Sequence, residues 1–153
     1  MAGTFTQIYI QAVFAVRGRQ NLLKKEWRQE IFKYMAGIIK KKKHKPIIVN
    51  GVSDHVHVFI GMKPSMALSD LIRDIKNNTS NHINNRGLLN GHFSWQEGYG
   101  AFSYSHDHIG NVHNYILNQE KHHEKKTFKE KYFEFLDEYE VPYEERFLFD
   151  WLD

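Results

Sequence analysis

Apolar positions along the chain follow two different periods in its first third. Over residues 5–17 apolar and polar residues partly alternate, and β-branched and aromatic side chains are frequent, which is typical of a long strand. Over residues 21–43 the apolar residues recur at helical spacing instead, at Leu22, Leu23, Trp27, Ile31, Met35 and Ile38. Pro46 cannot extend a helix because it has no backbone N–H. The pattern predicts a strand and then a long amphipathic helix that ends before Pro46.

The middle of the chain predicts a hairpin followed by a second helix. Two apolar runs, Pro46–Val52 and His55–Met62, lie on either side of Ser53-Asp54, which is typical of two strands joined by a tight turn. A helix is expected over roughly residues 66–85, with a serine as its N-cap. Its predicted inner face consists of Leu68, Leu71, Ile72, Ile75 and Ile83.

The last third of the chain predicts shorter elements. Two short strands are expected at Phe93–Gln96 and Tyr99–Ser105, and two helices at Ile109–Lys121 and 127–139. Mixed strands and helices in this order indicate the α+β class with a largely antiparallel sheet. No linker divides the chain, so we expect one domain over residues 1–140 and a tail over residues 141–153.

Composition and charge narrow the class of partner. The net charge is +3, but residues 137–153 contain seven acids and one base, which leaves +9 on residues 1–136. A basic body fits a polyanion such as nucleic acid, although a solvated surface with an acidic end explains the charge equally well. The chain has no cysteine, which excludes disulfides and thiolate zinc sites. No apolar run is long enough to span a membrane, and we expect a cytoplasmic protein.

Two histidines on the third predicted strand form a candidate metal site. Side chains at positions i and i+2 of a strand share a face, so His55 and His57 are able to grip one divalent cation. With ten histidines in the chain the spacing also arises by chance, and two hydrogen-bonded histidines at a sheet face are the alternative. Asp54 either orients one imidazole or is an ordinary turn residue.

Tyr115 and Gln119 are candidates for the chemistry itself. They stand four residues apart on a predicted helix and therefore share a face. A tyrosine can attack phosphorus covalently, and an amide oxygen suits Mg2+ or Mn2+. The alternative for Tyr115 is an ordinary core aromatic. The sequence has no GxxxxGK[ST] loop, so no nucleotide cofactor is expected.

Basic and polar side chains on the two long helices are candidates for contact with DNA phosphates. Lys42 and Lys43 belong to the run of lysines in which the first helix ends, and Arg73, Lys76 and Ser80 lie on the second. A solvated helix surface is the alternative for both groups.

Several motifs together resemble a known family. His55-Val56-His57 and Tyr115-Ile116-Leu117-Asn118-Gln119 look like the HUH and Tyr-x-x-x-Gln motifs of small single-tyrosine HUH transposases. These are the TnpA-type enzymes of bacterial insertion sequences and their REP-associated relatives. Residues 51–54, 95–102, 119–123 and 127–128 match in the same order, so the resemblance covers roughly residues 5–137.

The resemblance implies a fold, a reaction and partners. The implied fold is ferredoxin-like, with helices packed on one face of the sheet, and the implied assembly is a homodimer in which a tyrosine helix can serve the other subunit. His55, His57 and Gln119 become ligands of Mg2+ or Mn2+, and Tyr115 becomes the nucleophile. The implied reaction cleaves and rejoins single-stranded DNA at hairpin-flanked ends through a 5′-phosphotyrosine, and it releases a 3′-OH.

Two other functions compete with an active transposase. A domesticated, REP-associated type of protein would bind or process hairpin DNA without mobilising an element. An RNA-binding ferredoxin-like protein is the third possibility, but the expected sheet lacks the Lys/Arg-Gly-Phe/Tyr pattern of RNA-binding strands.

Overall fold

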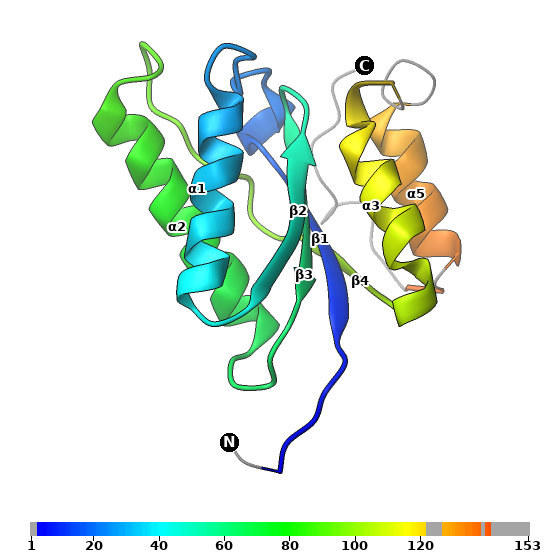
Figure 1. The fold of residues 1–153 in the computed structure, drawn as a ribbon. Helices are drawn as coiled ribbons and strands as arrows, with labels where there is room; N and C mark the ends of the chain where they lie inside the picture. Colours follow the sequence, from blue (N-terminus) through cyan, green and yellow to red (C-terminus); the bar gives the residue numbers. More distant parts are fainter. Residues whose placement is uncertain (1–2, 122–126, 139, 142–153) are drawn as a thin grey trace.

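The computed structural model describes residues 3–121, 127–138, 140 and 141. Its centre is a single antiparallel sheet with the strand order β2-β3-β1-β4 (Figure 1). The strands are β1 (Tyr9–Ala15), β2 (Lys45–Gly51), β3 (His55–Gly61) and β4 (Gly100–Tyr104). Helix α1 (Arg28–Lys41) connects β1 to β2, and α2 (Leu68–Arg86) connects β3 to β4. This order is ferredoxin-like, and the predicted α+β class and antiparallel sheet are confirmed.

Helices cover both faces of the sheet. Helices α1 and α2 lie on one face, whereas α3 (Ile109–Leu117) and α5 (Phe128–Glu138) lie on the other (Figure 1). The expectation that the helices pack on one face is therefore wrong for α3 and α5. Strands β1 and β3 bury side chains on both faces: on the second face Val13 and Ala15 pack with residues of α5, and Phe59 packs with α3. Such a sheet excludes water only if both faces are covered.

The main core lies between the sheet and the first pair of helices. Alternate residues of β1 and β3 point into it, and each is fully buried: Ala12, Phe14, Val56, Val58 and Ile60. They pack against Ile31 and Met35 of α1 and against Leu71 and Ile75 of α2. This layer contains the apolar stripes of both helices that the sequence predicts.

Some element boundaries differ from the prediction. Helix α1 begins at Arg28, seven residues later than expected, although Leu23 ahead of it is fully buried and donates its N–H to the carbonyl of Ser53. Burial of an apolar side chain does not by itself make the backbone helical. The expected strand at Phe93–Gln96 is reduced to one bridge between Val16 and Trp95.

The segment that carries Tyr115 and Gln119 is also interrupted. Helix α3 ends at Leu117, Asn118 forms a turn, and residues 119–121 are helical again. Asn118 donates a side-chain hydrogen bond of 2.8 Å to the carbonyl of Asn114. A polar side chain that bonds to the backbone in this way competes with regular helix, which accounts for the break inside the predicted helix Ile109–Lys121.

Close packing of α5 on β4 depends on a glycine. A Cβ at Gly100 would overlap the phenol ring of Tyr132, which is buried against this end of the strand. No helix in the described part of the chain is long and apolar enough to cross a bilayer. The expected acidic tail lies outside the described residues from residue 142 onward.

Candidate active site

The two histidines of β3 lie side by side beneath α3. Because side chains alternate along a strand, His55, His57 and Phe59 point to the face opposite the main core. Each imidazole is 2% exposed, and the two ring centres are 5.2 Å apart. The structure therefore brings together the pair that the sequence singles out.

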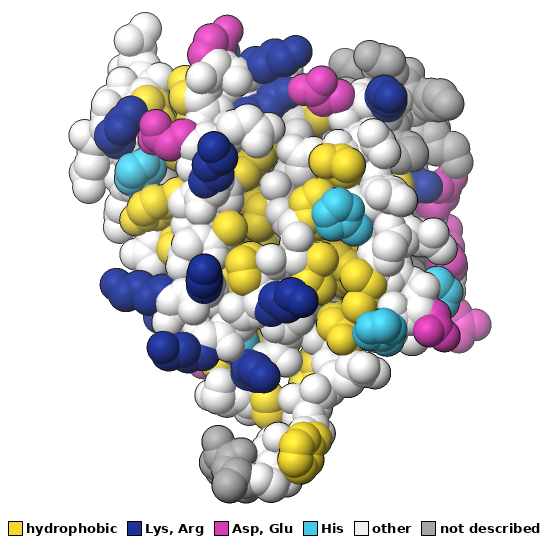
Figure 2. Space-filling model, in the orientation of Figure 1, with side chains coloured by type: hydrophobic (Ala, Val, Ile, Leu, Met, Phe, Trp, Pro, Cys, Tyr) yellow, Lys and Arg dark blue, Asp and Glu magenta, His cyan; other side chains and the backbone are white. Residues whose placement is uncertain are grey.

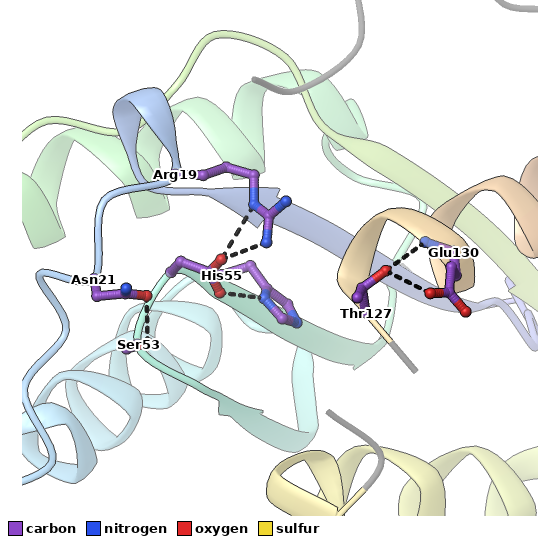
Figure 3. Close-up of polar contacts among 7 residues, drawn as sticks. Arg19, Asn21, Ser53, His55, Thr127 and Glu130 are labelled. Atoms are coloured by element: carbon purple, nitrogen blue, oxygen red, sulfur yellow. Dashed lines mark hydrogen bonds and ion pairs between the residues drawn. The ribbon is translucent and has the colours of Figure 1, made fainter. Parts of the chain in front are cut away.

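His55 is held by Asp54, which forms a buried ion pair with Arg19 in the short 3-10 helix after β1 (Arg17–Arg19). Its Nδ1 lies 2.8 Å from Oδ1 of Asp54, and Oδ2 of Asp54 accepts hydrogen bonds of 3.1 Å and 2.6 Å from Nε and Nη2 of Arg19 (Figure 3). Burial alone would raise the pKa of Asp54, but the hydrogen bond with His55 and the charge of Arg19 lower it to about 2. A carboxylate only accepts hydrogen bonds, so Nδ1 of His55 carries the proton.

His57 is held by a neutral partner. Its Nδ1 lies 2.8 Å from Oε1 of Gln11, and Nε2 of Gln11 donates a hydrogen bond of 2.8 Å to the phenol oxygen of Tyr104. An amide oxygen is also only an acceptor, so Nδ1 of His57 is protonated as well. In both imidazoles the lone pair is then on Nε2, which is the arrangement of histidines that ligate metals.

Tyr115 lies close to His57, and Gln119 lies next to Tyr115. The ring of Tyr115 is 6.0 Å from that of His57 in the same chain, with the planes at 84°. Gln119 is 3% exposed and donates a hydrogen bond of 3.2 Å to the backbone carbonyl of Tyr115. The site thus joins the two imidazoles of β3 to the phenol of Tyr115, whose backbone carbonyl accepts a bond from the amide of Gln119.

Apolar packing and hydrogen bonds from the side chain of Asn50 hold α3 over the sheet. Val112 and Ile116 of α3 pack on Phe59 of β3. Asn50 of β2 donates its side-chain N–H groups to the carbonyls of Ile116 and Leu117, at 3.0 Å and 3.2 Å. These bonds tie the end of α3, which carries Tyr115, to β2.

The electrostatic surroundings of Tyr115 keep its phenol protonated at neutral pH. Burial raises its pKa to about 12, and the charge of Glu134 adds to the rise, while hydrogen bonding by Gln119 opposes it. Nζ of Lys131 lies 5.1 Å from the centre of the ring. A groove lined by Gln11, Tyr104, Asn111, Tyr115 and Lys131, among others, opens beside this side chain. A ligand in the groove would touch the phenol directly.

The donor set fits a divalent cation with an open coordination sphere. In the described part of the chain no three His, Cys, Asp or Glu side chains are grouped to hold a metal. The set is instead two imidazoles that present Nε2 and the amide of Gln119, whose oxygen is a ligand that Mg2+ and Mn2+ accept. A cation held by these three groups would keep a coordination position open for a phosphate oxygen, as catalytic sites require.

The candidate DNA-contacting residues lie on the α1–α2 side of the sheet, away from the histidines. Basic side chains gather over the end of α1 and the start of β2 (Figure 2). Lys43 is exposed, whereas Lys42 pairs with Asp74 at 3.1 Å and Arg73 pairs with Asp70 at 3.2 Å.

Lys76 and Ser80 of α2 have other partners. Nζ of Lys76 donates to the carbonyls of Gln96 and Gly98, at 2.9 Å and 2.6 Å, and burial lowers its pKa to about 8. Lys76 therefore ties the segment before β4 to α2. The hydroxyl of Ser80 donates to the carbonyl of Asn77 at 3.2 Å.

Sequence reasoning missed three residues of the site. Gln11 is a fully buried polar residue within a predicted strand, and this pattern is the signal that could have found it, because buried amides require partners. Tyr104 is also in a predicted strand, where an aromatic attracts no attention. No local pattern distinguishes the buried Arg19 from the exposed Arg17 two positions earlier.

Comparison with known proteins decides the family. The family model described as "Transposase IS200 like" matches residues 4–119, which include every site residue from Gln11 to Gln119. The chain belongs to the IS200-like transposase family. The resemblance found in the sequence is thereby confirmed, and the family comprises enzymes that cut DNA during transposition. No curated protein matches the chain.

Solved structures agree on the fold of this family. A candidate transposase from Deinococcus radiodurans R1 is similar to the chain with a TM-score of 0.63 and 18% sequence identity, over 78% of this chain and 95% of the other. A REP-associated tyrosine transposase bound to a REP hairpin is similar with a TM-score of 0.58 and 14% identity, over 80% of this chain and 73% of the other. At these identities the likeness shows a shared fold.

Proposed function

We propose that the chain is a DNA transposase that cleaves and rejoins single-stranded DNA at hairpin-flanked ends. In this proposal Tyr115 is the nucleophile, and His55, His57 and Gln119 hold Mg2+ or Mn2+. The observation that carries the proposal is the position of the Tyr115 phenol next to the paired imidazoles, with ring centres 6.0 Å apart for Tyr115 and His57. A phenol beside two histidines that could bind a metal through Nε2 suits attack on a phosphodiester.

The reaction exchanges one phosphoester for another. Oη of Tyr115 attacks phosphorus, the bond from phosphorus to the 3′-oxygen breaks, and the DNA strand stays on the tyrosine through its 5′-phosphate. The phenol loses a proton and the leaving oxygen gains one, so a 3′-OH is released with no net change in protons. A later 3′-OH reverses the step, and no nucleotide cofactor is needed because the phosphodiester's energy is kept in the phosphotyrosine.

Side chains around the phenol prepare it for this step. A bound divalent metal would polarise the scissile phosphate as a Lewis acid and orient it. Asp54 and Gln11 hold the two imidazoles with Nε2 as the ligand atom. Lys131, 5.1 Å from the ring centre of Tyr115, adds positive charge where the phosphate must approach.

The proposed DNA-binding surface is the lysine-rich end of α1, where basic side chains gather (Figure 2), and it includes Lys42 and Lys43. Arg73 and Ser80 on the neighbouring helix extend it. The carbonyl contacts of Lys76 favour a structural role for this residue in place of a DNA contact. A homodimer that presents two such surfaces would hold two DNA ends at once.

Covalent capture with labelled oligonucleotides tests the proposal. Single-stranded oligonucleotides covering the DNA on both sides of the coding sequence are incubated with the protein and Mn2+. A 3′-labelled strand should become covalently attached, whereas a 5′-labelled strand should yield a shorter product with an extendable 3′-OH. Tyr115→Phe and chelation of the metal should each abolish the adduct. An adduct formed by Tyr115→Phe, or one that carries the 5′ label, would contradict the assignment.

The alternative is a domesticated protein of the REP-associated type, which acts on hairpins without moving an element. The structural likeness to the REP-associated transposase bound to a REP hairpin favours its consideration. The same assay separates the two functions. A transposase joins DNA ends from the two sides of its own gene, whereas the domesticated protein cuts hairpins repeated elsewhere in the genome and none beside its gene.

A further inference from the structure

We infer that Gln11, anchored by Tyr104, is a positioning residue that fixes the tautomer and orientation of His57. The inference rests on the proposed function, in which His57 is a metal ligand, and it assigns a role to two residues outside the transposase motifs. Neither residue would touch the metal. They would act through the imidazole by determining which ring nitrogen carries the lone pair.

The register of the sheet places these three side chains in one row. Gln11 of β1 lies opposite Phe59 of β3 on one side and opposite Phe102 of β4 on the other. His57 and Tyr104 each lie two residues from these partners, on the same face, so they are diagonal neighbours of Gln11 across the two strand pairs. Gln11 bridges them with two hydrogen bonds of 2.8 Å and is fully buried.

The chemistry of an amide suits this position. Its oxygen accepts only, so it selects the form of His57 with the proton on Nδ1. Its nitrogen donates only, and in the structure the phenol oxygen of Tyr104 accepts that bond, so both ends of the amide have a partner in this orientation. Tyr104 is itself held by an edge-on contact with the ring of Phe59, with centres 5.9 Å apart. A side chain without an acceptor would leave a buried Nδ1–H unpaired.

The neutral charge of Gln11 complements the other histidine. Asp54 on His55 is balanced by Arg19, with which it forms a buried ion pair. Gln11 gives His57 an acceptor that carries no charge. Both imidazoles are therefore oriented with a single buried carboxylate.

Two measurements on the intact protein test the inference. Nitrogen NMR of the metal-free protein, with its histidines labelled with 15N, reports the tautomer of His57. Calorimetric titration reports the affinity of the protein for Mn2+. Gln11→Leu should lose the Nδ1–H form of His57 and bind Mn2+ about 10- to 100-fold more weakly. Gln11→Glu keeps the acceptor and should retain both the tautomer and the affinity. Tyr104→Phe should give a smaller loss of affinity than Gln11→Leu.

Thr79→Val is the matched control for a buried hydrogen bond on the other side of the sheet. Thr79 is fully buried, and its hydroxyl accepts a bond of 3.0 Å from the indole of Trp95. This variant should lower thermal stability and leave the Mn2+ affinity unchanged. If Gln11→Leu is too unstable to purify, Gln11→Glu and Tyr104→Phe still distinguish the outcomes.

The results separate this inference from the proposed function. Suppose that the wild-type protein binds Mn2+ and that all of the Gln11 and Tyr104 variants bind it with the same affinity. This result would overturn the inference alone. An unchanged His57 tautomer in Gln11→Leu would overturn it as well. Failure of the wild-type protein to bind Mn2+ would overturn both the inference and the metal site of the proposed function.

Discussion

The two faces of the central sheet use the same strands for opposite purposes. On the face toward α1 and α2, the side chains of β1 and β3 are uniformly apolar, from Ala12 and Phe14 to Ile60. On the face toward α3, the alternate positions of the same strands carry Gln11, His55 and His57, all nearly or fully buried. On the first face the strands contribute only apolar side chains, whereas on the other they contribute polar side chains that need defined hydrogen-bond partners.

The difference shows how a small domain holds a buried polar site. Burying polar groups is costly unless each finds a partner, and the apolar face supplies the stability that offsets this cost. Stability and chemistry are therefore separable by residue position, because neighbours along one strand point to different faces. Substitutions on either face, or at the point where both meet, test this separation.

The largest effect is expected for His55→Ala with His57→Ala. Loss of the metal removes several kcal/mol of charge stabilisation, so the initial rate of covalent adduct formation should fall by about 100- to 1000-fold. The rate is measured with a 3′-labelled oligonucleotide under single-turnover conditions. A rate within a few-fold of the wild-type value would remove the metal from the proposed reaction.

Asp54→Asn should affect both the site and the stability of the fold, because Asp54 contacts His55 and also forms the buried ion pair with Arg19. The change removes the carboxylate charge that pairs with the buried Arg19, which we expect to lower the free energy of unfolding by about 3–5 kcal/mol. It should also weaken Mn2+ binding through His55. Urea titration at neutral pH measures the first effect.

The stability that Asp54 contributes should depend on acidity. Its pKa is lowered from 3.8 to about 2, so the contribution is complete above pH 3.8 and is lost as the pH falls toward 2. The advantage of the wild type over Asp54→Asn should shrink across this interval. An advantage that stays constant from pH 4 to pH 2 would show that the carboxylate is not the source.

Ile60→Val sharpens the comparison from the apolar face. Ile60 is fully buried in the main core on the strand that carries both histidines. Removing one methylene should cost about 0.5–1.5 kcal/mol in the free energy of unfolding. The Mn2+ affinity and the cleavage rate of folded protein should not change, and a change in either would mean that the two faces are coupled.

The smallest effect is expected for Lys43→Ala, outside both faces. If Lys43 contacts one phosphate, the slope of log affinity against log salt for single-stranded DNA should become shallower by about 0.7. Fluorescence anisotropy at several salt concentrations measures the slope. Lys25→Ala, just before the other end of α1, is the matched control and should leave the slope unchanged.

Much of the fold follows from local patterns in the sequence. Alternation over residues 5–17 and the hairpin around Ser53-Asp54 predict β1, β2 and β3, and helical spacing predicts α1 and α2. Alternation also predicts that His55 and His57 share a face. Helical spacing does not predict where α1 starts, because Leu22 and Leu23 continue the helical pattern although they lie in an irregular segment.

The supporting residues of the site escape local reasoning because their partners are distant in the chain. Gln11 and His57 are 46 positions apart, Gln11 and Tyr104 are 93, and Arg19 and Asp54 are 35. Only the strand order β2-β3-β1-β4 brings them together. The second layer of helices was missed for a similar reason, since the apolar residues of β1 and β3 do not reveal from sequence which helices cover them.

The nearness of Tyr115 to His57 within one chain has a consequence for stoichiometry. If the geometry of a single copy is the working one, each polypeptide contains a complete cutting unit, and the specific rate should not fall on dilution below the concentration at which copies associate. Mixing Tyr115→Phe protein with His57→Ala protein should then restore no cleavage, because the intact Tyr115 of one variant would not act at the intact His57 of the other.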